Sequence, residues 1–188
     1  MKTIMVDMDE VLCIGGHLGI VNKFLNTSYK VEDLSGYYTE DMLPKERLQE
    51  YYQFFKTENP YQYAEIIPDA REVLEKLSKK YQLFICTAYY SDVYDMEQSH
   101  CLIDKYKWLQ QNFPFISPYQ YVFINDKSLL NCDIKIDDRL SNLKGYGEQK
   151  YLFDSYHNQE ICDEELEKEG VIRVSGWKEL ETILLKEE

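Results

Sequence analysis

Short apolar runs that end in polar residues recur along the chain. The first covers Thr3 to Val6 and ends at Asp7, and the second covers Leu83 to Cys86 and ends at Thr87. Further runs of this kind lie at 121–124, 134–136, 151–153 and 171–174. Runs of this length that are rich in β-branched and aromatic residues are typical of buried strands. The pattern therefore predicts a series of strands with polar residues after their carboxyl ends.

Helical patterns fill most of the intervals between these runs. The clearest begins after Pro68, where Asp69 and Glu72 have the spacing of a capping box. Apolar stripes at helical period lie on three predicted helices: Ala70, Val73, Leu74 and Leu77; Leu102, Tyr106, Leu109 and Phe113; and Trp177, Leu180, Ile183 and Leu184. Strands that alternate with helices pair in parallel, so we expect an α/β fold with an open parallel sheet covered on both faces.

The segment between the first predicted strand and the helix after Pro68 is too long for a simple connection. It is rich in Tyr, Phe, Asp and Glu, and the stretch from Lys45 to Phe55 has apolar side chains at helical spacing. Gly15-Gly16 and Ser35-Gly36 mark turns. We expect a single domain over residues 1–188, with a small helical cap inserted at approximately 15–66.

Composition and charge limit the partners that this domain can have. The hydrophobic fraction of its 188 residues is 44%, which is enough for a packed globular protein. The net charge of −13 argues against a nucleic-acid polymer or an anionic membrane as a partner, because both need a basic face. A small anionic substrate is compatible with this charge if a metal ion or a few basic side chains concentrate positive charge in one pocket.

Cysteine usage and hydropathy indicate a reducing compartment. The five cysteines are odd in number and widely spaced, without a Cys-x-x-Cys pair or a zinc-ligand spacing, so we expect reduced, buried thiols. No apolar run approaches the roughly 18 residues that span a bilayer, and the amino terminus enters a strand pattern without a basic leader. We predict a cytoplasmic protein, and the sequence leaves open whether it forms a homodimer.

Polar residues at the predicted strand ends are candidates for one site. Ligands of open parallel sheets bind beyond the carboxyl ends of the strands. Asp7, Thr87, Lys127 and Asp137 each lie at or just after such an end. A single aspartate at a strand end is often an ordinary turn residue, but the combination favours a shared site.

The acidic residues of this group occur in pairs. Asp7 and Asp9 are two residues apart after the first strand, and Asp137 and Asp138 are adjacent at the end of the run that begins at residue 134. Converging carboxylates repel one another unless a cation lies between them. Oxygen ligands without Cys or His nearby favour Mg²⁺ over zinc, and Mg²⁺ leaves room for water and a substrate phosphate. The sequence therefore predicts a magnesium-dependent phosphate site.

These residues resemble the four sequence motifs of the haloacid dehalogenase-like phosphatase superfamily. Asp7-Met8-Asp9 matches the first motif, Thr87 the second, Lys127 the third, and the pair Asp137-Asp138 the fourth, in the same order. The resemblance implies a Rossmann-like open parallel sheet with a small cap after the first strand. It also implies an enzyme that hydrolyses a phosphomonoester with Mg²⁺ as cofactor.

The resemblance gives each acidic residue a role. Asp7 would attack phosphorus to form an aspartyl-phosphate, while Asp9 would protonate the leaving oxygen and later activate water. Asp7, the backbone carbonyl of Asp9 and Asp138 would ligate Mg²⁺, with Asp137 acting through water or on neighbouring groups. The sequence leaves open which of Asp137 and Asp138 binds the ion directly.

Within the superfamily, the chain is similar to the 5′(3′)-deoxyribonucleotidases, which hydrolyse nucleoside 5′- and 3′-monophosphates. The likeness spans most of the chain and includes Asp-Met-Asp-x-Val-Leu, Ile-Cys-Thr, Lys-Tyr-x-Trp, Asp-Lys and Ile-Asp-Asp-Arg. It implies that Thr87, Lys127 and Lys105 hold the substrate phosphate. A solvated helix lysine is an equally good interpretation of Lys105. Arg139 would close the site, pair with the acids or form a surface salt bridge.

Two departures from the family pattern bear on the substrate. Glu10 stands where many members have Gly, and Ala88 stands where a hydroxyl residue often follows the Thr. Aromatic residues of the insertion could stack on a nucleobase but are more typical of packing. None of them is therefore assigned to the site: Tyr29, Tyr37, Tyr38, Tyr51, Tyr52, Phe54 and Phe55.

Other functions stay open at this point. A sugar phosphate or another small metabolite would suit the same chemistry if the cap pocket is polar. A noncatalytic phosphate-binding or regulatory protein could keep the fold, although the presence of both Asp7 and Asp9 argues against it. A phosphotransferase or dehalogenase would use the same nucleophile. The sequence does not identify the preferred base or sugar, or the position of the phosphate.

Overall fold

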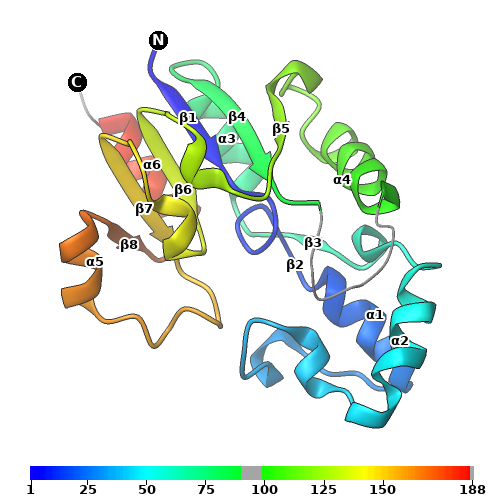
Figure 1. The fold of residues 1–188 in the computed structure, drawn as a ribbon. Helices are drawn as coiled ribbons and strands as arrows, with labels where there is room; N and C mark the ends of the chain where they lie inside the picture. Colours follow the sequence, from blue (N-terminus) through cyan, green and yellow to red (C-terminus); the bar gives the residue numbers. More distant parts are fainter. Residues whose placement is uncertain (90–98, 187–188) are drawn as a thin grey trace.

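A parallel sheet forms the centre of the protein (Figure 1). The computed structural model describes residues 1–89 and 99–186. Within them the large sheet has the order β5-β4-β1-β6-β7-β8, and all neighbouring strands run parallel. Its strands are β1 Thr3–Val6, β4 Gln82–Thr87, β5 Tyr121–Phe123, β6 Ile134–Asp137, β7 Gln149–Phe153 and β8 Ile172–Val174. The predicted α/β fold with an open parallel sheet is confirmed.

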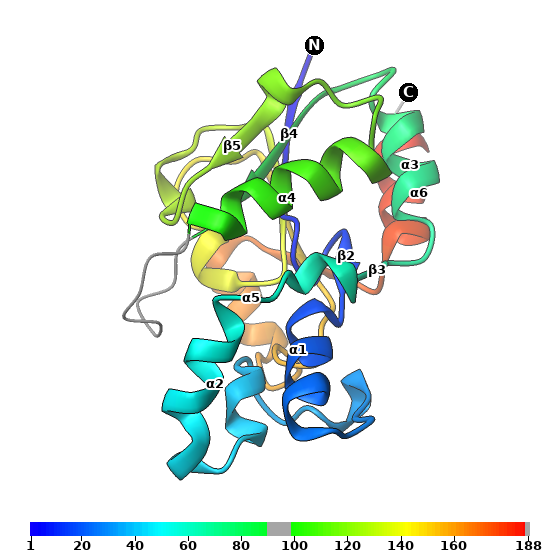
Figure 2. The same ribbon diagram turned by 90° about the vertical axis from the view of Figure 1, so that its right-hand side faces the viewer.

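The two faces of this sheet are covered differently. The elements on them are α3 Ala70–Leu77, α4 Ser99–Asn112, α5 Asp163–Glu169 and α6 Trp177–Lys186, with short 3₁₀ turns η5 Pro118–Gln120, η6 Lys127–Leu129 and η7 Leu140–Leu143. Ile4 and Val6 of β1 pack with α3, α4 and α6 in one apolar cluster. Met5 points to the opposite face, which is covered near η6, η7 and α5. Figure 2 shows α3 and α6 side by side on their face.

The helix after Pro68 forms as predicted, but the predicted side-chain cap at its amino terminus does not. All four apolar residues of its stripe are buried. Asp69, however, has a left-handed backbone with φ 66° and makes no side-chain cap hydrogen bond, so the predicted capping box is wrong. Its carboxylate lies instead 3.7 Å from Lys178 Nζ of α6. A charged partner on a neighbouring helix replaces the local cap.

The stripe predicted for α4 is partly wrong, because the helix is rotated about its axis. Tyr106 is 40% exposed, whereas Lys105 is only 6% exposed and shares the buried face with Trp108 and Leu109. A buried lysine needs an acidic or polar partner beneath it. Apolar periodicity alone cannot anticipate such a partner.

Residues between β1 and α3 form a layer beyond the carboxyl ends of the sheet, at the end of the molecule opposite the two termini (Figures 1 and 2). Its elements are β2 Cys13–Ile14, α1 Gly16–Leu25, η1 Val31–Asp33, η2 Thr39–Met42, η3 Lys45–Arg47, α2 Leu48–Phe55, η4 Pro60–Gln62 and β3 Glu65–Ile66. The strands β2 and β3 pair antiparallel where the chain enters and leaves this layer. We call residues 15–66 the insertion; that it is a cap stays a prediction.

The insertion has an apolar core of its own, which includes Ile20, Tyr51 and Phe55. Helix α1 was not predicted, and Gly16, taken as a turn residue, is its first residue. Gly19 allows α1 to approach Tyr63 closely, because a Cβ at position 19 would lie 2.2 Å from the Tyr63 Cβ. Long-range packing therefore explains a glycine that disfavours a helix locally.

Two further expectations concern the whole chain. All five cysteines are free and four are buried, but Cys162 is exposed, so the expectation of buried thiols is wrong at that position. Among the helices of the described residues, none combines the length and apolarity that a membrane crossing requires.

Candidate active site

A tight loop after β1 places Asp7 and Asp9 at the carboxyl edge of the sheet. Asp7 stays in register with the sheet, since its amide donates to the Ile136 carbonyl of β6 at 3.0 Å. The chain then curls, and the Leu12 amide donates to the Met8 carbonyl at 2.8 Å. The loop is also fixed from α6, where Trp177 Nε1 donates to the Val11 carbonyl at 2.8 Å. Both carboxylates therefore stand on a rigid support.

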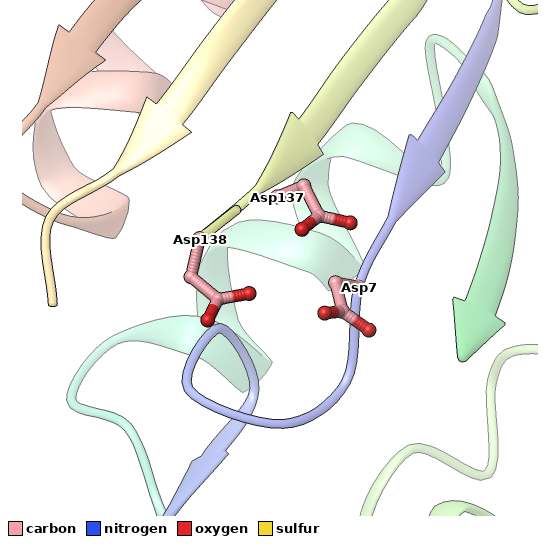
Figure 3. Close-up of side chains that lie close together, drawn as sticks. All are labelled: Asp7, Asp137 and Asp138. Atoms are coloured by element: carbon pink, nitrogen blue, oxygen red, sulfur yellow. The ribbon is translucent and has the colours of Figure 1, made fainter. Parts of the chain in front are cut away.

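Asp7, Asp137 and Asp138 form an acidic cluster at the ends of β1 and β6 (Figure 3). One carboxylate oxygen of each lies within 4.8 Å of the others, and all three side chains are buried. Lys127 Nζ lies 2.6 Å from Asp7 Oδ1 and 2.8 Å from Asp137 Oδ2. One ammonium group thus contacts two of three neighbouring carboxylates.

Burial and mutual repulsion oppose the full ionisation of this cluster. Burial raises the pKa of Asp7 to about 6 against the opposing charge of Lys127, and the charges of Asp137 and Asp9 add to the rise. Burial, followed by Asp137 and Asp7, raises the pKa of Asp138 well above its usual value. Burial also opposes the charge of Lys127, but Asp137 and Asp7 outweigh it and hold the lysine pKa above its usual value. Further positive charge would therefore stabilise the ionised form of this cluster.

Asp137 and Asp138 differ in their hydrogen-bond partners. Asp137 Oδ1 accepts from the Arg139 amide at 3.0 Å and from Asn142 Nδ2 at 2.9 Å. Asp138 Oδ2 lies 2.6 Å from His157 Nε2, but the buried Asp138 Oδ1 has no hydrogen-bond partner among the described residues. A buried oxygen without a partner is costly unless a cation or another donor binds it. These all-oxygen donors fit Mg²⁺, which prefers carboxylates and water.

Asp9 belongs to a second group of side chains, which faces the insertion. Lys105 Nζ donates to Asp9 Oδ2 at 2.5 Å and to Thr87 Oγ1 at 2.6 Å, and Tyr61 Oη donates to Asp9 Oδ1 at 2.8 Å. Burial opposes the charge of Asp9, but Lys105, His17 and the Tyr61 hydrogen bond outweigh it and lower the pKa of Asp9 to about 2. Lys105 is therefore not a solvated helix lysine, and it joins Thr87 to Asp9.

A pocket of about 170 Å³ lies beside this group, between the insertion and the sheet edge. Asp9, Ala88 and Lys105 line it from the sheet side. Most residues that line it belong to the insertion. Several of these are aromatic or apolar, among them Leu18, Tyr37, Tyr38, Phe55 and Tyr61. Some aromatic residues that the sequence left unassigned therefore line the pocket, whereas Tyr51 packs inside the insertion.

Comparison with known proteins decides the family. A family model described as "5′ nucleotidase, deoxy (Pyrimidine), cytosolic type C protein" matches residues 1–188. The chain belongs to this family. A Staphylococcus aureus protein named provisionally as a 5′(3′)-deoxyribonucleotidase is 31% identical over 186 residues, 98% of this chain and 96% of that one. The resemblance to the deoxyribonucleotidases is thereby confirmed.

Solved structures support the fold of this nucleotidase. A haloacid dehalogenase-like family hydrolase from Streptococcus pneumoniae has a TM-score of 0.51 and 19% identity over 98% of both chains. A D,D-heptose 1,7-bisphosphate phosphatase from B. bronchiseptica, complexed with magnesium and phosphate, has a TM-score of 0.57 and 11% identity over 100% of both chains. At these identities the likeness shows a shared fold.

The nucleotidase departs from its family's pattern at Glu10, and the backbone explains why Gly is common there. Glu10 has φ 60°, a left-handed conformation that glycine adopts without strain. Its Oε2 is buried without a hydrogen-bond partner in the described part of the chain. Burial, followed by the charges of Asp9 and Asp7, raises the pKa of Glu10 to about 8. The backbone of Glu10 is therefore strained, and the fold disfavours the ionised form of its carboxyl group.

Glu10→Gly is expected to raise the free energy of unfolding by about 1 to 2 kcal/mol, because it removes left-handed strain and a buried carboxyl. Urea unfolding of the metal-free protein measures the change. Glu10→Gln is the matched control, since it removes the ionisable carboxyl group and keeps the strained backbone, and it should stabilise less. A destabilised Glu10→Gly variant would contradict the assignment of strain to this position.

Several residues that hold the site have no motif in the sequence. His157 contacts Asp138, and Asn158 Nδ2 donates to the Asp138 and Phe153 carbonyls at 2.8 Å each. Both follow the end of β7, so the rule that ligands bind beyond the carboxyl ends of the strands could have found them.

Tyr61 and Arg139 also contact the site or its surroundings. Tyr61, which contacts Asp9, lies in the insertion, and nothing in the sequence around it indicates this contact. Arg139 stacks on Tyr37, with 4.5 Å between its guanidinium carbon and the ring centroid.

Proposed function

We propose that this protein is a magnesium-dependent phosphatase that hydrolyses nucleoside monophosphates, with Asp7 as its nucleophile. The observation that carries the proposal is that the acidic cluster with Lys127, the group of Lys105 and Thr87, and an aromatic-lined pocket meet at one edge of the sheet. The family, named for 5′ nucleotidases, supports the choice of substrate. A cytoplasmic location and the absence of polymer or membrane partners belong to the same proposal.

The described side chains suit a metal-assisted attack by Asp7. The Met8 amide and Lys127 both contact Asp7 Oδ1, at 2.6 Å each, and so hold that oxygen in place. Asp7, the Asp9 backbone carbonyl and Asp138 would hold Mg²⁺, and the unpartnered Asp138 Oδ1 favours Asp138 over Asp137 as the direct ligand. Bound Mg²⁺ would draw charge from the phosphoryl oxygens. Lys127 would add to this effect from the protein side.

The two steps of the reaction divide between Asp7 and Asp9. An Asp7 oxygen attacks phosphorus, the bond to the leaving oxygen breaks, and Asp9 gives that oxygen a proton. Asp9 then takes a proton from the water that attacks the aspartyl-phosphate, which releases phosphate and restores Asp7. A substrate phosphate held by Lys105 and Thr87 would draw the Lys105 ammonium away from Asp9. Because Lys105 is the main group that lowers the Asp9 pKa, substrate binding prepares Asp9 to carry the proton.

The insertion is proposed to act as a cap that keeps water from the pocket and contacts the nucleoside. Its aromatic lining supports a nucleotide over a sugar phosphate, because bases stack on aromatic rings whereas sugars need polar partners. Ala88 lines the same pocket and offers no hydroxyl to the phosphate. Lys105 and Thr87 are then the donors on that side.

Phosphate release from a panel of deoxynucleoside monophosphates and sugar phosphates tests the proposal. With Mg²⁺, the nucleotides should have kcat/KM values at least about tenfold above those of the sugar phosphates. EDTA should remove the activity and added Mg²⁺ should restore it. If sugar phosphates are the better substrates, the chemistry holds and the substrate class is wrong. If no substrate is turned over, the noncatalytic alternative gains support.

A further inference from the structure

The two carboxylate oxygens of Asp138 have different surroundings. Oδ2 lies 2.6 Å from His157 Nε2, whereas the buried Oδ1 has no hydrogen-bond partner among the described residues. Both oxygens of the neighbouring Asp137, by contrast, accept hydrogen bonds. In Figure 3 one oxygen of Asp138 points toward the side chains of Asp7 and Asp137. Asp138 is therefore held at one oxygen from outside the acidic cluster, and the other oxygen is left for the cluster.

The His157 side chain is itself firmly held. It is only 6% exposed. The rings of Tyr37 and Tyr156 both contact its imidazole edge to face, with 4.9 and 5.3 Å between ring centroids. Tyr37 in turn carries the Arg139 guanidinium over its face. A ring packed in this way has little freedom to turn, so the direction of its Nε2 is fixed.

The backbone next to His157 is tied to the strand that carries Asp138. Asn158 Nδ2 donates to the carbonyls of Asp138 and Phe153 at 2.8 Å each. Arg173 of β8 donates to Asn158 Oδ1 at 2.8 Å and to the Asn158 carbonyl at 3.1 Å. These contacts join the ends of three neighbouring strands, β6, β7 and β8. They set the distance between His157 and Asp138 independently of the contact between the two side chains.

We propose that His157 positions Asp138 to bind Mg²⁺ through a single oxygen and thereby favours Mg²⁺ over Ca²⁺. The inference rests on the proposed function, because it takes Asp138 as a ligand of the ion. An ionised carboxylate only accepts hydrogen bonds, so the imidazole donates from Nε2 to Oδ2 and leaves Oδ1 to the ion. His157 acts through Asp138, as residues that orient metal ligands do.

The preference between the two ions follows from the coordination that each requires. Mg²⁺ demands a compact octahedral shell, which a single carboxylate oxygen suits. The larger Ca²⁺ readily takes both oxygens of one carboxylate. With Oδ2 held by His157, Asp138 cannot offer both oxygens without losing a buried hydrogen bond.

Two substitutions of His157 test the role of its N–H group. His157→Leu keeps an apolar side chain of moderate size among the tyrosines and removes the donor, whereas His157→Gln keeps an N–H donor at the end of the side chain. His157→Leu should bind Mg²⁺ about 10- to 100-fold more weakly than the wild type. His157→Gln should recover most of that affinity. The matched control is His100→Leu, since His100 of α4 contacts Phe55 of the insertion, and it should keep the wild-type affinity.

The affinity is measured without turnover, from the rise of the thermal unfolding midpoint of the metal-free protein as MgCl₂ is added. Packing lost in a variant lowers the midpoint at every Mg²⁺ concentration, whereas a weakened site shifts the concentration at which the rise begins. The same titration with CaCl₂ should show a smaller loss of affinity in His157→Leu, because Asp138 is then free to offer both oxygens. The ratio of the Mg²⁺ and Ca²⁺ affinities should therefore fall in this variant.

Three results overturn the inference about His157: an unchanged Mg²⁺ affinity in His157→Leu, a Gln variant as weak as the Leu variant, or equal losses for Mg²⁺ and Ca²⁺. A wild type that Mg²⁺ does not stabilise, and whose phosphate release survives EDTA, overturns the metal dependence of the proposed function as well. The two failures are therefore distinguishable.

Discussion

Replacing Asp7 with asparagine is expected to lower phosphate release by at least about 10³-fold, because the amide keeps the shape of the side chain but cannot attack phosphorus. The measurement is release of phosphate from a deoxynucleoside monophosphate with saturating Mg²⁺. Asp163→Asn, at an exposed position that begins α5, is the matched control and should retain wild-type turnover. Substantial residual activity in Asp7→Asn would mean that water attacks the substrate directly.

A loss of activity in Asp7→Asn will not result from unfolding. Burial and the neighbouring carboxylates raise the pKa of Asp7 despite Lys127, so the fold disfavours its charge, and in the variant Lys127 keeps Asp137 as its partner. The variant should therefore unfold at the same or a higher urea concentration. Acid quenching of the wild type during turnover should also trap a phosphorylated residue 7, which the variant lacks. These two measurements separate a nucleophile from a residue that only supports the fold.

The sheet and half of the site could be predicted because both follow from short-range rules. Apolar runs ending at Asp7, Thr87 and Asp137 mark buried strands, and parallel strands bring their carboxyl ends to one edge. The structure places Asp7 and Asp137 within one cluster and Thr87 beside Asp9 through Lys105. The rule of strand ends needs no knowledge of the tertiary packing, so it works on sequence alone.

The rest depends on how distant segments pack, which no local pattern records. Lys105 faces inward because Asp9 and Thr87 lie beneath α4, and this rotates the stripe that apolar residues alone predicted. Asp69 stands at the N-cap of α3, but its side chain lies near Lys178 of a later helix instead of capping the helix. Glu40 and Tyr61 line the pocket because of the way the insertion folds. They lie in short 3₁₀ turns, which show no apolar periodicity in the sequence.

Lys127→Met is expected to destabilise the metal-free protein by about 3 to 5 kcal/mol, because it leaves Asp7 and Asp137 as buried carboxylates without their cation. Turnover should fall by at least about 10²-fold with the loss of a charge near the phosphoryl group. Methionine keeps most of the volume of the lysine stem, so packing changes little. Urea unfolding with and without Mg²⁺ measures the effect on stability.

A control variant at a second buried lysine distinguishes two effects of Lys127→Met, namely the loss of a charge pair and the removal of a buried lysine side chain. Lys135 of β6 is fully buried, but its Nζ donates to the Lys144 carbonyl at 2.7 Å, and burial lowers its pKa. Lys135→Met therefore removes a charge that the fold disfavours and should cost only about 1 kcal/mol. Mg²⁺ should restore stability to Lys127→Met, since the ion neutralises the same carboxylates, and should restore little to Lys135→Met. Equal losses in the two variants, or no rescue of Lys127→Met by Mg²⁺, would show that Lys127 does not balance the acidic cluster.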